Sequence, residues 1–407
     1  MKDSPARVLG VCLGSVVLLS LISFPSLAAE SIKDALKDGK ANADLRYRAE
    51  LVDQDGVSED AQASTLRLRL GYKTDTFRGL FAHAEFEGLK VIGAEQYNST
   101  ANGLTQFPVV VDPEDEEINQ AYIGYTGLED TTLKLGRQRI KLDNDRFVGN
   151  VGWRQLEQTY DAFSLQHDFN KKIAVFYAHL NNANRVFGEH HPVPASANTN
   201  LSGDLLNASF KTTAGKLTAY AYLLELEDDP AASHQNVGLR FSGSHAFENG
   251  FKLLYTAELA DQSDYKDGAS TIDAGYHLVE AGAVFERVTV KLGYEVLEGD
   301  GVYAFQTPLA TLHAFNGWTD KFLSTPPTGL EDTYLSVSSV VAGIRLMAVL
   351  HDFSPDAGGA DYGSELGLVA TKTFKKSYTV GAKYASFDAD SFTTDTEKLW
   401  ITLGLKL

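Results

Sequence analysis

Apolar and polar residues alternate along most of the chain, in segments of about ten residues. In residues 64–72, three leucines occupy one face of an extended chain, and Arg67 and Arg69 occupy the other. Residues 288–296 and 398–407 show the same pattern. A period of two residues is typical of a β-strand with one apolar and one polar face. The chain is therefore predicted to be all-β.

About eighteen such segments are predicted, and an even number is usual for bacterial outer-membrane barrels. Long and short connections alternate between them: residues 73–77 and 126–130 are short, whereas 90–116, 136–157 and 298–331 are long. Tight turns at one rim and long loops at the other indicate a transmembrane barrel. We therefore predict an antiparallel β-barrel with long extracellular loops and short periplasmic turns. The predicted strands begin near Ala43, Ser64, Gly79, Glu117, Thr131, Gln158, Lys171, Gly203, Lys216, Gln235, Gly250, Asp273, Val288, Asp332, Val341, Tyr362, Ser377 and Glu397.

The first 28 residues have the features of a secretory signal peptide: a basic start, a short apolar stretch and small residues at the cleavage site. Residues 29–407 are then a single barrel domain in the outer membrane of a Gram-negative bacterium. The one cysteine, Cys12, lies in the signal peptide. The mature chain therefore has no disulfide and no thiolate metal site, and neither a metal nor a cofactor is predicted.

The chain is strongly acidic, with a formal net charge of −18. Such a charge disfavours nucleic acid as a partner. Much of the negative charge falls in predicted loops, including residues 112–117 and 227–229. Solvated surface is the plain interpretation of these acidic runs, and binding of divalent cations that bridge lipopolysaccharide is the alternative. Outer-membrane lipid and lipopolysaccharide are the predicted surroundings.

If the apolar strand faces meet lipid, the polar faces line the lumen. Acids share this inner face with bases, so two interpretations stay open. The bases either attract anionic solutes into the channel, or they pair with facing acids and only solvate the lumen. The predicted pore-lining bases are Arg46, Arg48, Arg67, Arg69, Lys134, Arg240, Lys252, Lys291, Arg345 and Lys383.

A basic and aromatic stretch, Gly136–Phe163, separates two predicted strands on the long-loop side. We predict that it lines the narrowest part of the pore, with Phe147 and Trp153 packed against the wall. The alternative is a solvated loop whose bases meet only the acids beside them. The bases predicted to form the constriction and bind the solute are Arg137, Arg139, Lys141, Arg146 and Arg154.

Four segments carry a resemblance to a known family: Gly136–Phe163, Leu312–Leu335, His351–Leu366 and Tyr384–Trp400. Together they resemble the alginate export family of outer-membrane proteins. The resemblance implies an eighteen-stranded monomeric barrel whose basic pore passes an anionic polysaccharide such as alginate. It also implies that a long loop folds inward and forms the constriction. Residues 136–157 hold that place here, with Arg137, Arg139, Arg146 and Arg154 carried over from the family.

The predicted function is that of an outer-membrane porin for passive passage of anionic solutes, such as anionic oligosaccharides or polysaccharides. A general, weakly selective porin is the alternative. An adhesive or structural barrel is a further one, as is a barrel enzyme that brings together a serine and a histidine, such as Ser209 and His179. No catalytic residue is predicted. The transported solute, the direction of transport and any periplasmic partner stay open.

Overall fold

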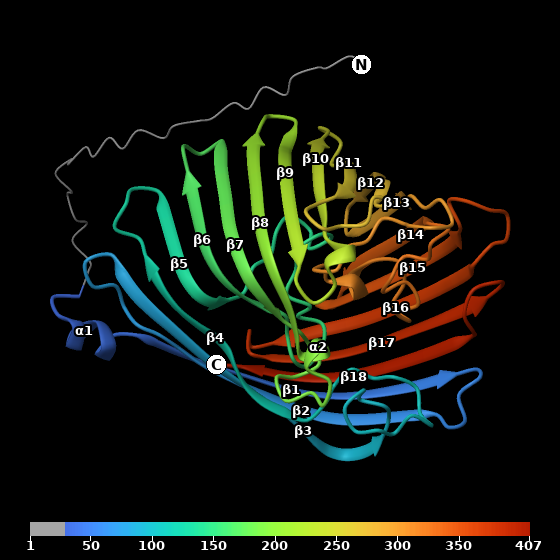
Figure 1. Cartoon of the computed structure of the whole chain (residues 1–407), viewed down its shortest axis with the longest axis horizontal. Helices are drawn as coiled ribbons and strands as arrows, with labels where there is room; N and C mark the ends of the chain where they lie inside the picture. Colours follow the sequence, from blue (N-terminus) through green and yellow to red (C-terminus); the bar gives the residue numbers. More distant parts are fainter. Residues whose placement is uncertain (1–28) are drawn as a thin grey trace, which may run out of the picture.

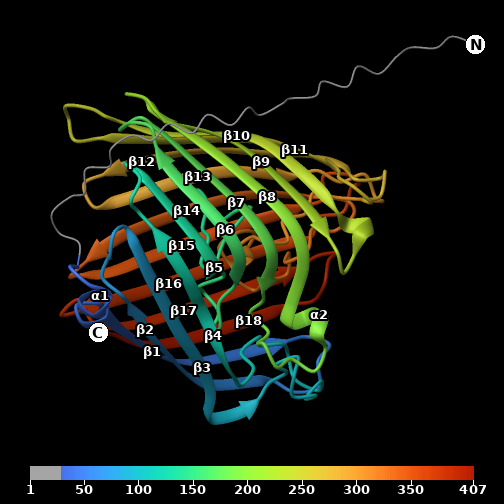
Figure 2. The ribbon, with the colours of Figure 1, turned by 60° about the vertical axis from the view of Figure 1, so that its left-hand side comes forward.

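The computed structural model describes residues 29–407, which form an eighteen-stranded antiparallel β-barrel (Figures 1 and 2). Strand β1 (Lys40–Gln54) pairs with β18 (Thr396–Lys406), so the sheet closes on itself. Closure leaves no free edge to pair with another chain. The predicted fold class is confirmed. The predicted signal peptide, residues 1–28, lies outside the described residues.

Every predicted strand has one observed counterpart, and the first residues agree within a few positions. The largest difference is at β8, which begins at Asn198 rather than Gly203 because pairing with β7 continues past a bulge. The remaining strands are β2 (Ala61–Lys73), β3 (Leu80–Gln96), β4 (Asp115–Tyr125), β5 (Thr131–Gln138), β6 (Thr159–Asp168), β7 (Ile173–Asn184), β8 (Asn198–Lys211), β9 (Gly215–Leu226), β10 (His234–Ala246), β11 (Lys252–Asp264), β12 (Asp273–Phe285), β13 (Val288–Leu297), β14 (Leu330–Val341), β15 (Ile344–Ser354), β16 (Gly363–Phe374) and β17 (Tyr378–Ala389).

Helices are few and short. Helix α1 (Ile32–Lys37) precedes β1, and its first turn is capped by Ser31, whose hydroxyl accepts a hydrogen bond from the Asp34 N–H. The others are α2 (Pro194–Ala197), η1 (Pro230–Ala232) and η2 (Leu312–Ala314). Among residues 29–407, no helix is long and apolar enough to cross a membrane.

The outer face of the barrel is apolar, as the alternation predicts. Leu135, Leu259 and Leu292 are 57 % to 65 % exposed on this face. In a membrane, hydrocarbon rather than water surrounds such side chains. Directly paired residues share a face, so the pairing of Arg46 with Arg67 places both inside the barrel.

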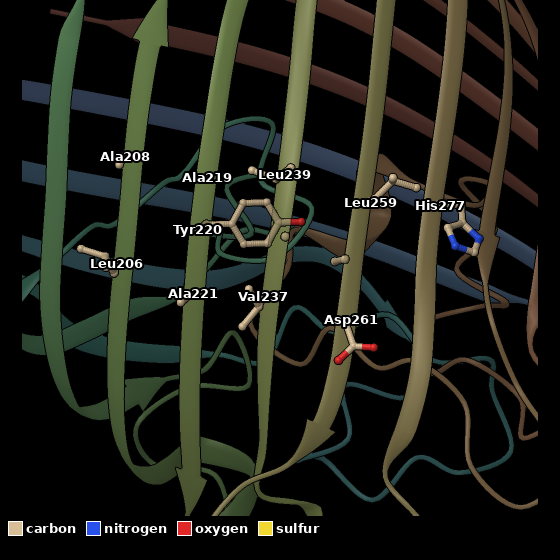
Figure 3. Close-up of a pocket in the computed structure, with 12 residues that line it drawn as sticks. Leu206, Ala208, Ala219, Tyr220, Ala221, Val237, Leu239, Leu259, Asp261 and His277 are labelled. Atoms are coloured by element: carbon tan, nitrogen blue, oxygen red, sulfur yellow. The ribbon is translucent and has the colours of Figure 1, made fainter. Parts of the chain in front are cut away.

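A shallow apolar groove lies on this outer face, across strands β8 to β12 (Figure 3). Small residues, including Ala208, Ala219 and Ala221, form its floor, and Leu206 and Leu259 are among the larger residues that flank it. Its lining is almost entirely apolar, in keeping with a surface that faces lipid. The groove is therefore separate from the lumen.

Candidate functional site

Two long loops fold into the barrel and meet there. One joins β5 to β6 (residues 139–158), and the other joins β13 to β14 (residues 298–329). The Gly149 N–H donates to the Leu309 carbonyl at 2.9 Å, and the Thr311 N–H donates to the Asp145 carbonyl at 3.0 Å. In Figure 1 both loops pass between opposite walls of the barrel. They are the pore loops, and only the first had been predicted to enter the lumen.

The 139–158 loop crosses the lumen to strands that are far from it in sequence. Phe147 packs against Tyr220 of β9 and Tyr276 of β12, with ring centres 5.1 Å and 5.4 Å away. Farther along the loop, Trp153 meets Trp400 of β18 edge to face, at 5.6 Å. Both aromatic residues pack against the inner wall as predicted. They hold the two ends of the loop on different sides of the barrel.

Two arginines of β1 hold the 139–158 loop by its backbone. Arg46 donates to the Gly152 carbonyl at 3.1 Å, and Arg48 donates to the Trp153 carbonyl at 2.7 Å. Arg46 also donates to the Gln155 side-chain oxygen at 2.7 Å. The planar guanidinium group suits this use because it presents several N–H donors in a fixed plane.

The neighbouring arginines of β2 are paired with acids. Arg67 contacts Asp44 at 2.5 Å, and Arg69 contacts Glu87 at 2.8 Å and Glu157 of the loop at 3.6 Å. We call Arg46, Arg48, Arg67 and Arg69 the clamp arginines. All four lie on the inner face as predicted, but their donors bind the loop and the wall.

Two of the five predicted constriction bases are buried. Arg146 is 1 % exposed and pairs with Glu295 of β13 at 2.8 Å. Arg154 is 6 % exposed and pairs with Asp320 at 2.9 Å and Glu50 at 3.3 Å. These pairs fasten the loop to the wall and to the second pore loop. Both residues are in the constriction region, but their charged groups are turned away from solvent.

Arg139 and Lys141 keep part of their side chains exposed. Arg139 pairs with Glu157 and with Glu85, the latter at 3.3 Å, and its side chain is 33 % exposed. Lys141 pairs with Asp145 at 2.9 Å, and its side chain is 50 % exposed. These two remain candidates for contact with a solute.

Arg137 does not lie in the lumen, and its prediction as a pore residue is corrected. It pairs in register with Ala121 of β4 and Asp161 of β6 and is two residues from the outward Leu135. Its guanidinium contacts Asp161 at 3.0 Å and the Ile118 carbonyl at 3.0 Å. The physical reason is strand parity: β5 continues through Gln138, so Arg137 takes the outer face.

The charges between the two pore loops are tightly balanced. Burial alone would raise the pKa of Glu157, but Arg69 and Arg139 outweigh it and lower this pKa to about 2. Burial would also raise the pKa of Asp320, yet His313, Lys398 and Arg154 keep it well below its usual range. Both carboxylates therefore stay ionised inside the barrel at neutral pH.

Bases near the short turns have different surroundings. Within residues 29–407, Lys73, Lys134, Lys252 and Arg345 have no carboxylate within ion-pair distance. The Lys73 ammonium lies 4.2 Å from the Phe81 ring centre, and the Lys134 ammonium lies 5.0 Å from that of Tyr122. We call these four residues the short-turn bases. Lys73 was missed because the sequence pattern placed it in a turn rather than at the end of β2.

The two other predicted lumen bases outside the clamp have acid partners. Lys291 pairs with Glu280 at 2.9 Å, and Arg240 pairs with Glu258. Both bases line a cavity of about 400 Å³ between the 298–329 loop and strands β10 to β15. The tenth predicted residue, Lys383, lies on the same inner face and contacts both pore loops.

Several buried groups in the loops carry roles that sequence reasoning missed. His313 and Asp320 of the 298–329 loop contact each other at 2.6 Å. Asp112 was assigned to a solvated acidic run, but it is fully buried and accepts a hydrogen bond from the Gln155 N–H. The family resemblance of Leu312–Leu335 was the one signal that could have directed attention to the second pore loop.

No catalytic or metal constellation appears in the described part of the chain. Among residues 29–407, no serine hydroxyl is hydrogen-bonded to a histidine ring, and His179 instead contacts Asp204 on the outer face. Within the same range, no group of three or more acids, histidines or cysteines could hold a metal ion.

Comparison with solved structures finds barrels of the same fold. Pseudomonas aeruginosa OccK9 (OpdG) is 13 % identical, with a TM-score of 0.72 over 92 % of this chain and 99 % of that one. Acinetobacter baumannii OccAB4 is 12 % identical, with a TM-score of 0.69 over 91 % and 98 %. P. aeruginosa OpdK, solved with vanillate, is 12 % identical, with a TM-score of 0.66 over 91 % and 99 %.

Sequence comparison identifies the family. The curated proteins give no significant match. The profile of the alginate export family, however, matches residues 38–303, which is more than half of the chain. Together with the closed barrel, this match places the protein in the outer membrane of a Gram-negative bacterium, as a channel. The chain belongs to the alginate export family.

Proposed function

We propose that this channel passes anionic solutes, with oligosaccharide acids and small organic anions as the main candidates and an anionic polysaccharide such as alginate as a further one. The observation that carries the proposal is the set of short-turn bases, which lack carboxylate partners in the described chain. An unpaired cation at a narrow, low-dielectric wall raises the local concentration of anions.

The short-turn bases are accessible in a way that the clamp arginines are not. Lys73, Lys252 and Arg345 are exposed and Lys134 is half-buried, whereas Arg48 and Arg67 are each only 2 % exposed. A solute that moves along the inner wall can therefore reach the short-turn bases. Aromatic rings beside Lys73 and Lys134 give an organic anion an apolar surface to contact as well.

The fold neighbours are compatible with this proposal. OpdK was solved with vanillate, and the carboxylate of vanillate is an anion at neutral pH. We extend only the chemical class, an organic anion, to this chain. Lipopolysaccharide and outer-membrane lipid would surround the barrel, and we propose that it acts as a monomer.

A general, weakly selective porin is the second candidate. Acid partners favour it, because Arg139, Arg240 and Lys291 are each paired with a carboxylate on the lumen side. Such pairs cancel much of the field that would otherwise select anions. The two functions differ in whether charge or only size decides the rate of passage.

Uptake into proteoliposomes tests the proposal with three sugars of nearly equal size: glucuronate, glucose and glucosamine. The full mature chain should admit glucuronate fastest and glucosamine slowest. Replacing Lys73 and Lys134 by glutamine should bring the three rates together. Equal rates in the unmodified channel would establish the general porin instead, and faster passage of glucosamine would refute anion preference.

A further inference from the structure

Lys383 of β17 lies in a cage made by all three tryptophans of the chain. Its Nζ is 3.8 Å from the ring centre of Trp318, 4.2 Å from that of Trp153 and 5.4 Å from that of Trp400. An ammonium within about 6 Å of an aromatic ring is attracted to the negative face of that ring. Aromatic faces therefore make up much of the surroundings of this cation.

A chain of hydrogen bonds leads from the caged ammonium into the 298–329 loop. Lys383 Nζ lies 2.7 Å from His313 Nε2, and His313 Nδ1 lies 2.6 Å from a carboxylate oxygen of Asp320. An ammonium can only donate, so Nε2 accepts and Nδ1 carries the ring proton toward Asp320. The His313 ring also stacks on Trp153, with centres 4.1 Å apart and planes 7° from parallel.

The cage joins four parts of the molecule. Trp153 belongs to the 139–158 loop, and His313 and Trp318 belong to the 298–329 loop. Lys383 and Trp400 belong to the wall, on β17 and β18.

Asp320 extends these contacts to a second wall residue. It pairs with Arg154 of the first loop at 2.9 Å and with Lys398 of β18 at 3.4 Å. The cage and the acid beside it therefore contact both pore loops and the wall at one place.

The indole N–H groups show what holds two of the rings in place. The Nε1 atoms of Trp153 and Trp400 are buried and have no hydrogen-bond partner within the described chain. A buried donor without a partner is unfavourable, so other contacts must fix these rings. The contacts that do so are the stacking with His313 and the attraction to Lys383.

We propose that Lys383 is a positioning residue of the channel, which holds both pore loops against the wall and thereby sets the aperture. Its role differs from that of the short-turn bases, because its ammonium is directed into the cage and not toward a solute. Loss of this cation should release the loops and leave the charge of the open lumen nearly unchanged.

Single-channel recording of Lys383→Met in a planar bilayer tests this role. The side chain keeps its length but loses the charge and the hydrogen bond to His313. We expect a higher mean conductance and more open-channel noise than in the unmodified channel, and Lys383→Arg should restore part of the difference. Lys252→Met is the matched control, because Lys252 is an inner-wall lysine that contacts neither pore loop.

Tryptophan fluorescence provides a second, independent readout. In a Trp318→Phe, Trp400→Phe background, Trp153 is the remaining fluorophore and reports the position of the 139–158 loop. Adding Lys383→Met should shift its emission to longer wavelength and increase its quenching by acrylamide, since water reaches the ring. Adding Lys252→Met should change neither quantity.

Two results would overturn the proposal. One is a folded Lys383→Met barrel with unchanged conductance, noise and Trp153 emission. The other is a loss of anion preference with unchanged conductance, which would make Lys383 a pore-lining charge. If Lys383→Met does not assemble, Asp320→Asn removes the loop end of the same hydrogen-bond chain without changing a strand. It must then raise conductance and noise for the proposal to stand.

Discussion

Arg48 and Lys134 are both bases on the inner wall, yet their surroundings have little in common. Arg48 is 2 % exposed and donates to a loop carbonyl. Lys134 is half-buried near the short turns and lies over the Tyr122 ring without a carboxylate beside it. The clamp consists entirely of arginines, whereas three of the four short-turn bases are lysines.

This difference teaches that position on the inner face does not decide what a base does. Arginine has a planar set of donors that can bind backbone carbonyls and carboxylates together, whereas lysine is a compact point charge on a flexible stem. The clamp arginines therefore build the constriction, and the short-turn bases remain available to a solute. Four changes test this division.

The largest expected effect comes from breaking the clamp at its most buried pair. Arg146→Met leaves Glu295 without its base, and removing one partner of a buried ion pair costs about 3–5 kcal/mol. Urea unfolding in lipid vesicles should show this loss, and single-channel records should become noisier. Lys141→Ala is the control, because its half-exposed pair with Asp145 contributes about 1 kcal/mol or less. Equal losses in the two variants would contradict the assignment.

Acid should weaken the same region. The pKa of Glu157 is lowered from 4.5 to about 2, so its pairs with Arg69 and Arg139 stabilise the folded state fully above about pH 4.5. That contribution is lost as the pH falls toward 2. Conductance noise should therefore rise over this window, and Glu157→Gln should be noisy already at neutral pH and respond less to acid. A flat record in the unmodified channel from pH 5 to pH 2 would refute the role of Glu157.

A change at the short turns should affect selectivity without affecting stability. Lys73→Gln with Lys134→Gln removes two cations that have no acid partner, so the anion-to-cation permeability ratio should fall severalfold. The free energy of unfolding should change by less than about 1 kcal/mol, since no ion pair is broken. Reversal potentials measure the first quantity and urea unfolding the second. A large loss of stability with unchanged selectivity would reverse the comparison between the two regions.

The smallest effect is expected at Arg137. This side chain lies on the outer face and pairs with the partly exposed Asp161. Arg137→Gln should leave conductance and selectivity unchanged and cost about 1 kcal/mol or less. Altered selectivity in planar bilayers would return Arg137 to the pore.

The fold could be predicted from the sequence because each strand is amphipathic over enough residues to fix its face. Leu68 and Arg69 show this pattern: they were assigned to opposite faces and lie on them. The alternation of long and short connections then gave the topology. The position of Arg137 could not be predicted, because it required the end of β5, and strand ends depend on pairing with neighbours.

The site was less predictable for a different reason. Contacts such as Arg146 with Glu295 join residues that are far apart in the chain, and nothing local indicates them. A basic loop gives the same pattern whether its charges meet a solute or distant carboxylates. The pairing of Lys383 with a tryptophan cage likewise depends on how two loops and two strands meet.

The reversal potential of the unmodified channel across a KCl gradient tests the central claim most directly. Chloride and potassium have nearly equal mobility in water, so the sign of the potential reports the charge preference of the pore. The account predicts the sign of an anion-selective channel, which becomes more pronounced at low salt because screening is weaker. A potential of zero, or one of the opposite sign, would contradict it.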